Sequence, residues 1–285
     1  MKPSLVHWCC QHFSEDWDIE RTCRTALDLG CSAVELVSTG DYPILAKHGL
    51  TCPMCQIDTG SEPPFLRGFN HPGNWDRLTK ITRETILLAA GFGFPNVICF
   101  TGYDRENPDD PQSPAINPAT GAERCAEGLA PLAEFAAFHG VTLCLEMLNT
   151  RVVDHPMKGH PGYQGDHIDY CAGIVKRIGS PAIKLLFDCY HVQVMDGDLI
   201  RRIQTHAPII GNVHIAGNPG RAEPNASQEI HYPAVLRALA KAGYQGHVGL
   251  EFLPIGDPIT GLRQAIELCR TSSLNPNNPN LTDPS

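Results

Sequence analysis

The feature that most constrains the fold is a regular alternation of two kinds of segment along nearly the whole chain. Short apolar runs rich in β-branched residues are each followed by a longer segment whose apolar residues recur at helical spacing, which is typical of strand–helix units. Eight strands are predicted, at residues 5–10, 33–37, 51–57, 96–101, 141–148, 183–190, 209–216 and 248–253. The predicted helices between them include 19–29, 75–91, 121–139, 167–178 and 232–242.

Eight such units in one series favour a closed (β/α)8 TIM barrel over an open doubly wound sheet. No GxGxxG motif follows the first strand, so the pattern gives no sign of a dinucleotide site. The chain has 285 residues and no flexible linker in its interior, which predicts one α/β barrel domain over residues 1–271 and a polar C-terminal tail over residues 272–285. Four glycines are predicted to end helices: Gly30, Gly140, Gly179 and Gly243.

Composition and charge exclude several classes of protein. The chain is 42% hydrophobic and 19% charged, and it has no apolar run long enough to cross a membrane, so we expect a soluble protein with no membrane association. The first 20 residues lack the apolar stretch of a secretory signal, which predicts a cytoplasmic location. A net charge of −9 opposes binding to nucleic acid. Nothing in these patterns opposes a homo-oligomer.

The twelve cysteines are scattered along the chain, and several lie inside apolar runs, which predicts buried free thiols rather than disulfides. Cys52 and Cys55 form a CxxC pair, but a strand at 51–57 directs their side chains to opposite faces of the sheet. No second pair completes a zinc site. We therefore expect neither a redox nor a zinc role for these two thiols.

Four consecutive predicted strands carry polar residues near their C-terminal ends, where barrel enzymes build their active sites. An unpaired charge buried there costs several kcal/mol, so each carboxylate needs a strong partner, and a shared cation satisfies them all. Three carboxylates and one imidazole suit Mn²⁺ or Mg²⁺, with Zn²⁺ or Co²⁺ also possible, although a hydrogen-bonded core without metal is the alternative. The predicted ligands are Glu146, Asp188, His214 and Glu251.

Other residues near the predicted mouth have weaker signals. Glu35 has either a hydrogen bond near the site or a structural ion pair. His7 and Trp8 either line the mouth or pack in the core, and packing is the first interpretation for both. Three further residues are predicted to bind substrate: His191, Arg221 and Glu229. The alternative for His191 is a surface loop histidine, and the alternative for Arg221 is a solvent-facing arginine. As a binding residue, Arg221 suits a substrate carboxylate.

Three runs resemble the hydroxypyruvate isomerases of the xylose isomerase-like TIM barrel superfamily: LEMLNTR at 145–151, LLFDCYHVQVMDGDL at 185–199 and GNVHIAGNPGRAEPNASQEIHY at 211–232. The resemblance implies interconversion of hydroxypyruvate and tartronate semialdehyde through an enediolate, with Glu146 and Glu251 as the acid–base pair. One departure is His214, where those isomerases often have glutamine. In having histidine at that position, this chain is similar to the metal-dependent ketose 3-epimerases.

Two other functions therefore remain in view: a ketose 3-epimerase or other sugar isomerase, and a barrel that binds a sugar without catalysis. Retention of both glutamates disfavours the second. The endonuclease IV type of DNA repair enzyme has a related barrel, but its three zinc ions need a richer set of ligands than this chain offers. A small hydroxy-carbonyl acid or sugar is the expected partner.

Overall fold

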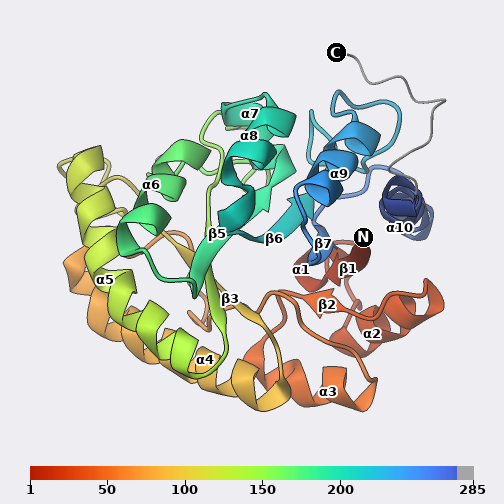
Figure 1. Ribbon diagram of the computed structural model, residues 1–285, viewed down its shortest axis with the longest axis horizontal. Coiled ribbons are helices and arrows are strands. Elements are labelled where there is room, and N and C mark those ends of the chain that lie inside the picture. The colour runs from red at the N-terminus through yellow and green to blue at the C-terminus, as the bar shows by residue number, and fades with distance from the viewer. Residues whose placement is uncertain (275–285) are drawn as a thin grey trace.

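The computed structural model, described over residues 1–274, contains a curled parallel sheet enclosed by helices (Figure 1). Its seven strands follow the order β2-β1-β7-β6-β5-β4-β3, and every pairing is parallel. The strands are β1 Lys2–Val6, β2 Val34–Glu35, β3 Asn96–Phe100, β4 Thr142–Glu146, β5 Ile183–Asp188, β6 Ile210–Ile215 and β7 His247–Leu250. This arrangement confirms the predicted TIM barrel.

The predicted strand at 51–57 is wrong as a regular strand, although this segment does close the ring between β2 and β3. Two isolated parallel bridges join Thr51 to Ala33 and Cys55 to Val97. Cys55 N–H donates to the carbonyl of Asn96 at 2.9 Å, which continues the barrel's hydrogen bonding across the gap. Pro53 lies between the bridges and has no N–H to donate, so the segment cannot form a continuous ladder.

The helices lie outside the sheet at nearly the positions that the periodicity predicts. They are α1 His7–Cys10, α2 Ile19–Asp28, α3 Tyr42–Lys47, α4 Trp75–Phe92, α5 Pro118–Phe138, α6 Ile168–Ile178, α7 Cys189–Met195, α8 Leu199–His206, α9 Tyr232–Lys241 and α10 Pro258–Leu274. The four predicted helix-ending glycines all have φ between 67° and 83°, a conformation that favours glycine. None of these helices is long and apolar enough to span a membrane, over the residues described.

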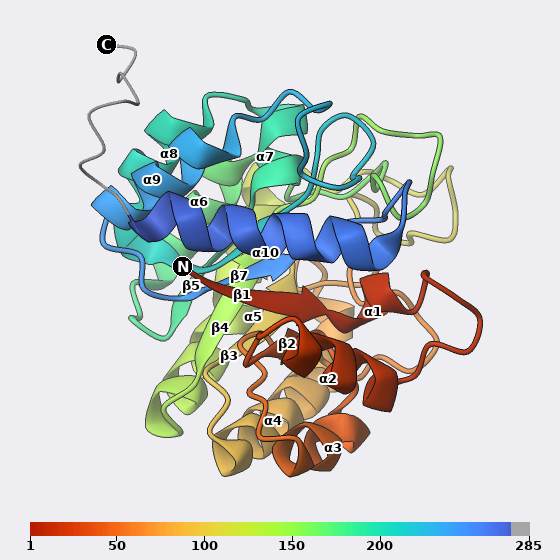
Figure 2. The same ribbon diagram turned by 90° about the vertical axis from the view of Figure 1, so that its right-hand side faces the viewer.

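Among the boundaries that differ from the sequence prediction, two bear on the site and on the tail. Residues 7–10 form the single helical turn α1 and not the end of a strand, so His7 and Trp8 follow β1 directly. Helix α10 continues through Leu274 and crosses beside β1 (Figure 2), so the first three residues of the predicted tail are helical. The remainder of that tail, residues 275–285, lies outside the described residues.

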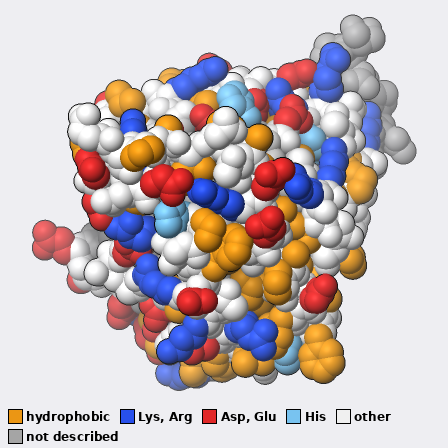
Figure 3. All heavy atoms as spheres, turned by 90° about the vertical axis from the view of Figure 1, so that its left-hand side faces the viewer, with side chains coloured by type: hydrophobic (Ala, Val, Ile, Leu, Met, Phe, Trp, Pro, Cys, Tyr) orange, Lys and Arg blue, Asp and Glu red, His pale blue; other side chains and the backbone are white. Residues whose placement is uncertain are grey.

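Two hydrophobic clusters stabilise the barrel. The larger cluster fills the layer between the sheet and the helices, and a smaller one fills the barrel interior with residues such as Met54, Ile98 and Leu186. All twelve cysteines are free and buried, as the sequence predicts. On the face seen in Figure 3, acidic and basic side chains are interspersed and not gathered by sign, in contrast to the basic patch of a nucleic-acid-binding surface.

Candidate metal centre and active site

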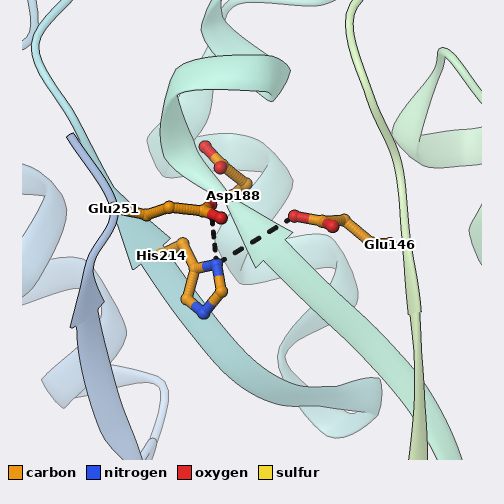
Figure 4. A group of neighbouring side chains, drawn as sticks. All are labelled: Glu146, Asp188, His214 and Glu251. Atoms are coloured by element: carbon orange, nitrogen blue, oxygen red, sulfur yellow. Dashed lines mark hydrogen bonds and ion pairs between the residues drawn. The ribbon is translucent and has the colours of Figure 1, made fainter. Parts of the chain in front are cut away.

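The four predicted metal ligands meet at one end of the barrel. Glu146 and Asp188 are the last residues of β4 and β5, His214 lies next to the end of β6, and Glu251 directly follows β7. Each residue offers one ligand atom, and these atoms all lie within 4.8 Å of one another. Figure 4 shows the side chains converging from neighbouring strands, with His214 between Glu251 and Glu146.

Two oxygen atoms of this cluster are suited to a cation because no hydrogen bond satisfies them, although Arg221 Nη2 lies 3.5 Å from one of them, Asp188 Oδ2. Glu146 Oε1 and Asp188 Oδ2 are buried and have no hydrogen-bond partner. The other oxygen of Asp188 accepts the backbone N–H groups of Tyr190 and His191 at 2.7 and 3.1 Å, which caps helix α7 and fixes the carboxylate. Orphaned buried carboxylate oxygens are costly, so the donor set fits a bound divalent cation.

The electrostatics separate the two glutamates. Burial, reinforced by the charge of Glu251, raises the pKa of Glu146 well above its ordinary value and that of Asp188 to about 7. Burial also opposes ionisation of Glu251, but Arg221 and His214 outweigh it and hold the pKa of Glu251 well below its ordinary value. Carboxylates that share a buried site resist ionising together, and a cation relieves this repulsion.

The ring of His214 contacts carboxylates through both of its nitrogens. Its Nδ1 lies 2.9 Å from Glu251 Oε2 and 4.0 Å from Glu146 Oε1. Its Nε2 lies 3.0 Å from Glu35 Oε2, which resolves the alternatives for Glu35 in favour of a contact at the site. Although burial alone lowers the pKa of His214, the charge of Glu251 and the hydrogen bonds to Glu251 and Glu35 raise it well above its ordinary value.

Arg221 points into the barrel mouth and is only 3% exposed, which excludes the solvent-facing alternative. It follows β6 with a φ of 52°, a conformation uncommon for non-glycine residues. Its guanidinium donates to the Met157 carbonyl and lies against Glu251 Oε2, each at 2.8 Å. Arg221 Nε is buried without a hydrogen-bond partner, so one donor of the fork is free for another acceptor.

The other two predicted substrate residues differ in position. His191 is fully buried, and its Nδ1 faces the backbone N–H of Asn149 at 3.1 Å. This contact leaves the proton on Nε2, which has no hydrogen-bond partner and lies 3.8 Å from Asp188 Oδ2. Glu229 instead bonds to the side chains of Asn218 and Gln193 at the surface and does not line the cavity described below.

A cavity of about 330 Å³ opens above the cluster and is bordered by Glu146, Glu251 and Arg221. Its walls include Phe65 and His160, whose rings lie 4.2 Å apart, together with the segment 59–65. A larger surface groove of about 1250 Å³ lies beside α10, but none of the four predicted metal ligands lines it. The smaller cavity is therefore the candidate active site.

Sequence interpretation missed several parts of this site. Trp8 Nε1 donates to Glu251 Oε1 at 2.9 Å, so Trp8 contacts a candidate catalytic residue instead of only packing. His7 does pack away from the cluster, against Thr22. His160 and the segment 59–65 carry no isolated motif, but both belong to loops at the C-terminal ends of the strands. That position is the signal that identifies them.

The comparisons with known proteins agree with this architecture. The profile of the family described as xylose isomerase-like TIM barrel matches residues 23–272. The putative hydroxypyruvate isomerase of Homo sapiens is 30% identical over 191 residues, which cover 67% of this chain and 65% of the human protein. The 2-oxo-tetronate isomerase of Cupriavidus necator is 36% identical over 136 residues, which cover 48% of this chain and 49% of that protein.

Among solved structures, the crystal structure of an AP endonuclease, family 2, from Brucella melitensis has a TM-score of 0.77 and 26% identity. It covers 92% of this chain and 97% of the other. Fold and site together define a TIM barrel with a buried carboxylate–imidazole cluster at its mouth. This chain belongs to the xylose isomerase-like TIM barrel family, as the sequence resemblance predicts.

Proposed function

We propose that this protein is a metal-dependent isomerase that interconverts hydroxypyruvate and tartronate semialdehyde. The proposal rests on one observation: two buried glutamates, Glu146 and Glu251, border the same cavity as the buried Arg221. The glutamates supply a proton acceptor and a proton donor, and the guanidinium supplies a partner for a substrate carboxylate. The names of the relatives, hydroxypyruvate isomerase and 2-oxo-tetronate isomerase, support this assignment.

The proposed cofactor is one divalent cation held by Glu146, Asp188, His214 and Glu251. Three carboxylates and one imidazole suit Mn²⁺ or Mg²⁺ best, and Zn²⁺ or Co²⁺ fit the same donors. When bound, the cation polarises the substrate carbonyl and stabilises the negative charge that develops on its oxygen. The cluster is the only group of possible metal ligands found among the described residues, which disfavours a three-zinc nuclease.

The reaction moves one proton between adjacent carbons of hydroxypyruvate. A base removes a proton from the hydroxymethyl carbon, an enediolate forms, an acid returns a proton to the former carbonyl carbon, and a hydroxyl proton moves between the two oxygens. Glu251 is the proposed base, because Arg221 and His214 hold its pKa low and keep it ionised. Glu146 is the proposed acid, because it is the other buried glutamate on the cavity and burial makes it readier than Glu251 to hold a proton. One of its oxygens would serve as the ligand, which leaves the other to carry that proton.

The proposed substrate-binding groups are Arg221 and His191, each of which has a buried donor atom without a partner. The guanidinium binds the substrate carboxylate, and His191 Nε2 donates to a substrate oxygen. Glu229, predicted from the sequence to bind substrate, is not included because its side chain is exposed and bonds to Asn218 and Gln193. His191 does not line the cavity either, but its Nε2 lies 3.8 Å from Asp188 Oδ2 in the ligand cluster. A cavity of about 330 Å³ lies at the lower end of the range for small-molecule sites, which suits a short acid.

A substrate panel tests this function directly. We expect the metal-loaded protein to isomerise hydroxypyruvate, to act on a four-carbon 2-oxo acid at a comparable or lower rate, and to turn over neutral ketoses much more slowly. Faster turnover of a ketose would identify the sugar epimerase alternative, which His214 makes the second candidate. Tight binding without exchange of solvent deuterium into any ligand would identify a non-catalytic barrel.

Replacing Arg221 with lysine should raise the Michaelis constant for hydroxypyruvate by about 10- to 100-fold, since a charge-assisted hydrogen bond contributes about 1.5 to 3 kcal/mol. Lysine presents a single ammonium and cannot reproduce the planar fork. Steady-state kinetics measure the effect, and a neutral ketose should show a much smaller one. Because Arg221 also contacts Glu251, a smaller decrease in kcat is expected.

Arg105→Lys is the matched control for that substitution. Arg105 bonds to the Ser113 carbonyl in a loop at the same end of the barrel and does not line the cavity. Its replacement should leave both kinetic constants close to wild type. An unchanged Michaelis constant for hydroxypyruvate in Arg221→Lys would remove the basis for an acid substrate.

A further inference from the structure

The two ring nitrogens of His214 face two different carboxylates on opposite sides of the imidazole. Nδ1 faces the ligand cluster, 2.9 Å from Glu251 Oε2 (Figure 4). Nε2 faces away from the cluster, 3.0 Å from Glu35 Oε2. Only Nδ1 is therefore directed at the position where Glu146, Asp188 and Glu251 offer oxygen atoms.

Glu35 is fully buried, and it does not line the cavity, so it has no route to the substrate. Three donors converge on its carboxylate: the hydroxyl of Ser4, the amide of Asn212 at 2.8 Å, and the ring of His214. Both Ser4 and Asn212 are themselves buried, at 0% and 1% exposure. A buried carboxylate is tolerated where donors satisfy it in this way. While it is ionised, a carboxylate accepts hydrogen bonds and has no proton to donate.

A glycine on the neighbouring strand β7 leaves room for the contact between His214 and Glu35. Gly249 on β7 is the register partner of His214 on β6. A Cβ atom at position 249 would lie 2.5 Å from His214 Cδ2, 2.9 Å from its Nε2 and 3.3 Å from Glu35 Oε1. Any larger residue would therefore displace the ring from Glu35, which makes the glycine a second and independent sign that this pairing is built into the barrel.

We propose that Glu35 is a positioning residue, which accepts the Nε2–H of His214 and thereby presents the Nδ1 lone pair to the divalent cation. The inference rests on the metal site of the proposed function. A neutral imidazole has one N–H and one lone pair, and the partner of one nitrogen decides which nitrogen carries the proton. A cation bound to Nδ1 takes the place of the proton that this nitrogen shares with Glu251, and Glu35, which only accepts, then keeps the remaining proton on Nε2 and increases the basicity of the ligand nitrogen.

Replacing Glu35 with glutamine tests this assignment. The amide is uncharged and is a weaker acceptor than the carboxylate, and its NH₂ group can take the place of an oxygen, so the Nε2–H tautomer of His214 loses its anionic partner. We expect the dissociation constant for Mn²⁺, measured from the free Mn²⁺ signal in electron paramagnetic resonance, to rise by about 10- to 100-fold. The metal measurement requires no substrate.

A double-mutant cycle separates positioning from a general structural effect. In the His214→Gln background, Glu35→Gln should leave the Mn²⁺ dissociation constant nearly unchanged, because Glu35 acts through the ring that is absent. Asp196→Asn is the matched control, since Asp196 is also largely buried and pairs with His167 outside the site. This control should bind Mn²⁺ like the wild type.

A measurement on the wild type keeps the inference testable even if Glu35→Gln does not fold. Long-range ¹H–¹⁵N correlation spectra of the Zn²⁺-loaded protein, with the His214 signals identified by their absence in His214→Gln, should show a protonated Nε2. A protonated Nδ1, or equal Mn²⁺ affinity of wild type and Glu35→Gln, would overturn the inference alone. A wild type that binds neither cation would instead overturn the metal site of the proposed function, and the inference with it.

Discussion

Replacing Glu251 with glutamine should lower turnover of hydroxypyruvate by about 10²- to 10⁴-fold, the usual contribution of a general acid–base group. The amide preserves the shape of the side chain and an oxygen atom for the cation, but it cannot accept the substrate proton. Trp8, His214 and Arg221 all contact this carboxylate, so its position is fixed before substrate binds. Deuterium on the hydroxymethyl carbon of the substrate should no longer wash out into solvent.

Glu146→Gln should lower turnover to a similar extent and yet differ in the isotope experiment. With Glu251 intact, the hydroxymethyl carbon still loses its deuterium to solvent, while the proton donor to the adjacent carbon is missing. Substrate recovered from this variant should therefore have lost deuterium without forming product. Mass spectrometry of the recovered acid distinguishes the two glutamates, which rate measurements alone do not.

Glu223→Gln is a matched control for both substitutions. Glu223 is another buried glutamate at this end of the barrel, where it accepts the backbone N–H groups of Ile255 and Gly256 without lining the cavity. The Glu223→Gln variant should turn over hydroxypyruvate at close to the wild-type rate. If either Glu146→Gln or Glu251→Gln retained normal turnover with its metal content confirmed, the two-glutamate mechanism would be wrong.

The sequence predicts the barrel because each layer of the fold leaves a local pattern. Parallel strands covered on both faces are continuous apolar runs, and helices that pack on one side have apolar residues at helical spacing. The prediction is wrong where the chemistry of one residue overrides that pattern. Pro53 removes a backbone donor within an otherwise apolar segment, and residues 7–10 turn into a helix although their composition suits a strand.

The four candidate ligands are also predictable, because the ends of parallel strands meet at one edge of the barrel. Contacts between distant parts of the chain are not predictable in this way. Glu35 and His214 lie 179 positions apart, and Trp8 and Glu251 lie 243 positions apart. The direction of a loop side chain is not predictable from the sequence for a related reason: Arg221 turns inward and Glu229 outward, although both belong to one turn-rich segment.

Removing the divalent cation by chelation should lower turnover by about 10²-fold or more, because it withdraws several kcal/mol of charge stabilisation from the transition state. Readdition of Mn²⁺ or Mg²⁺ should restore the rate. Independently of activity, the cation at 100 times its dissociation constant should raise the free energy of unfolding by about 2.7 kcal/mol. Full activity of a protein shown to be metal-free would contradict the proposed cofactor.

Cation affinity should also depend on pH, with a sign fixed by the ligands. The pKa of Asp188 is raised from 3.8 to about 7, and those of Glu146 and His214 are also raised, so all three ligands hold protons in acidic solution. Each proton that the cation must displace weakens its apparent affinity by about tenfold per pH unit below the pKa of that group. Titrations of Mn²⁺ should therefore show affinity decreasing as the pH falls below about 7.

The metal-free protein should respond to pH in the opposite direction. Its folded state keeps a proton on Asp188 that the unfolded chain releases, so this group's contribution to stability declines as the pH rises from 3.8 to about 7. The bound cation compensates the charge of the ionised carboxylate, so the stabilisation on adding metal should be larger at pH 8 than at pH 6. Thermal unfolding at the two pH values, with and without Mn²⁺, measures this difference. An equal gain at both would show that cation binding does not compete with protonation of the buried carboxylates.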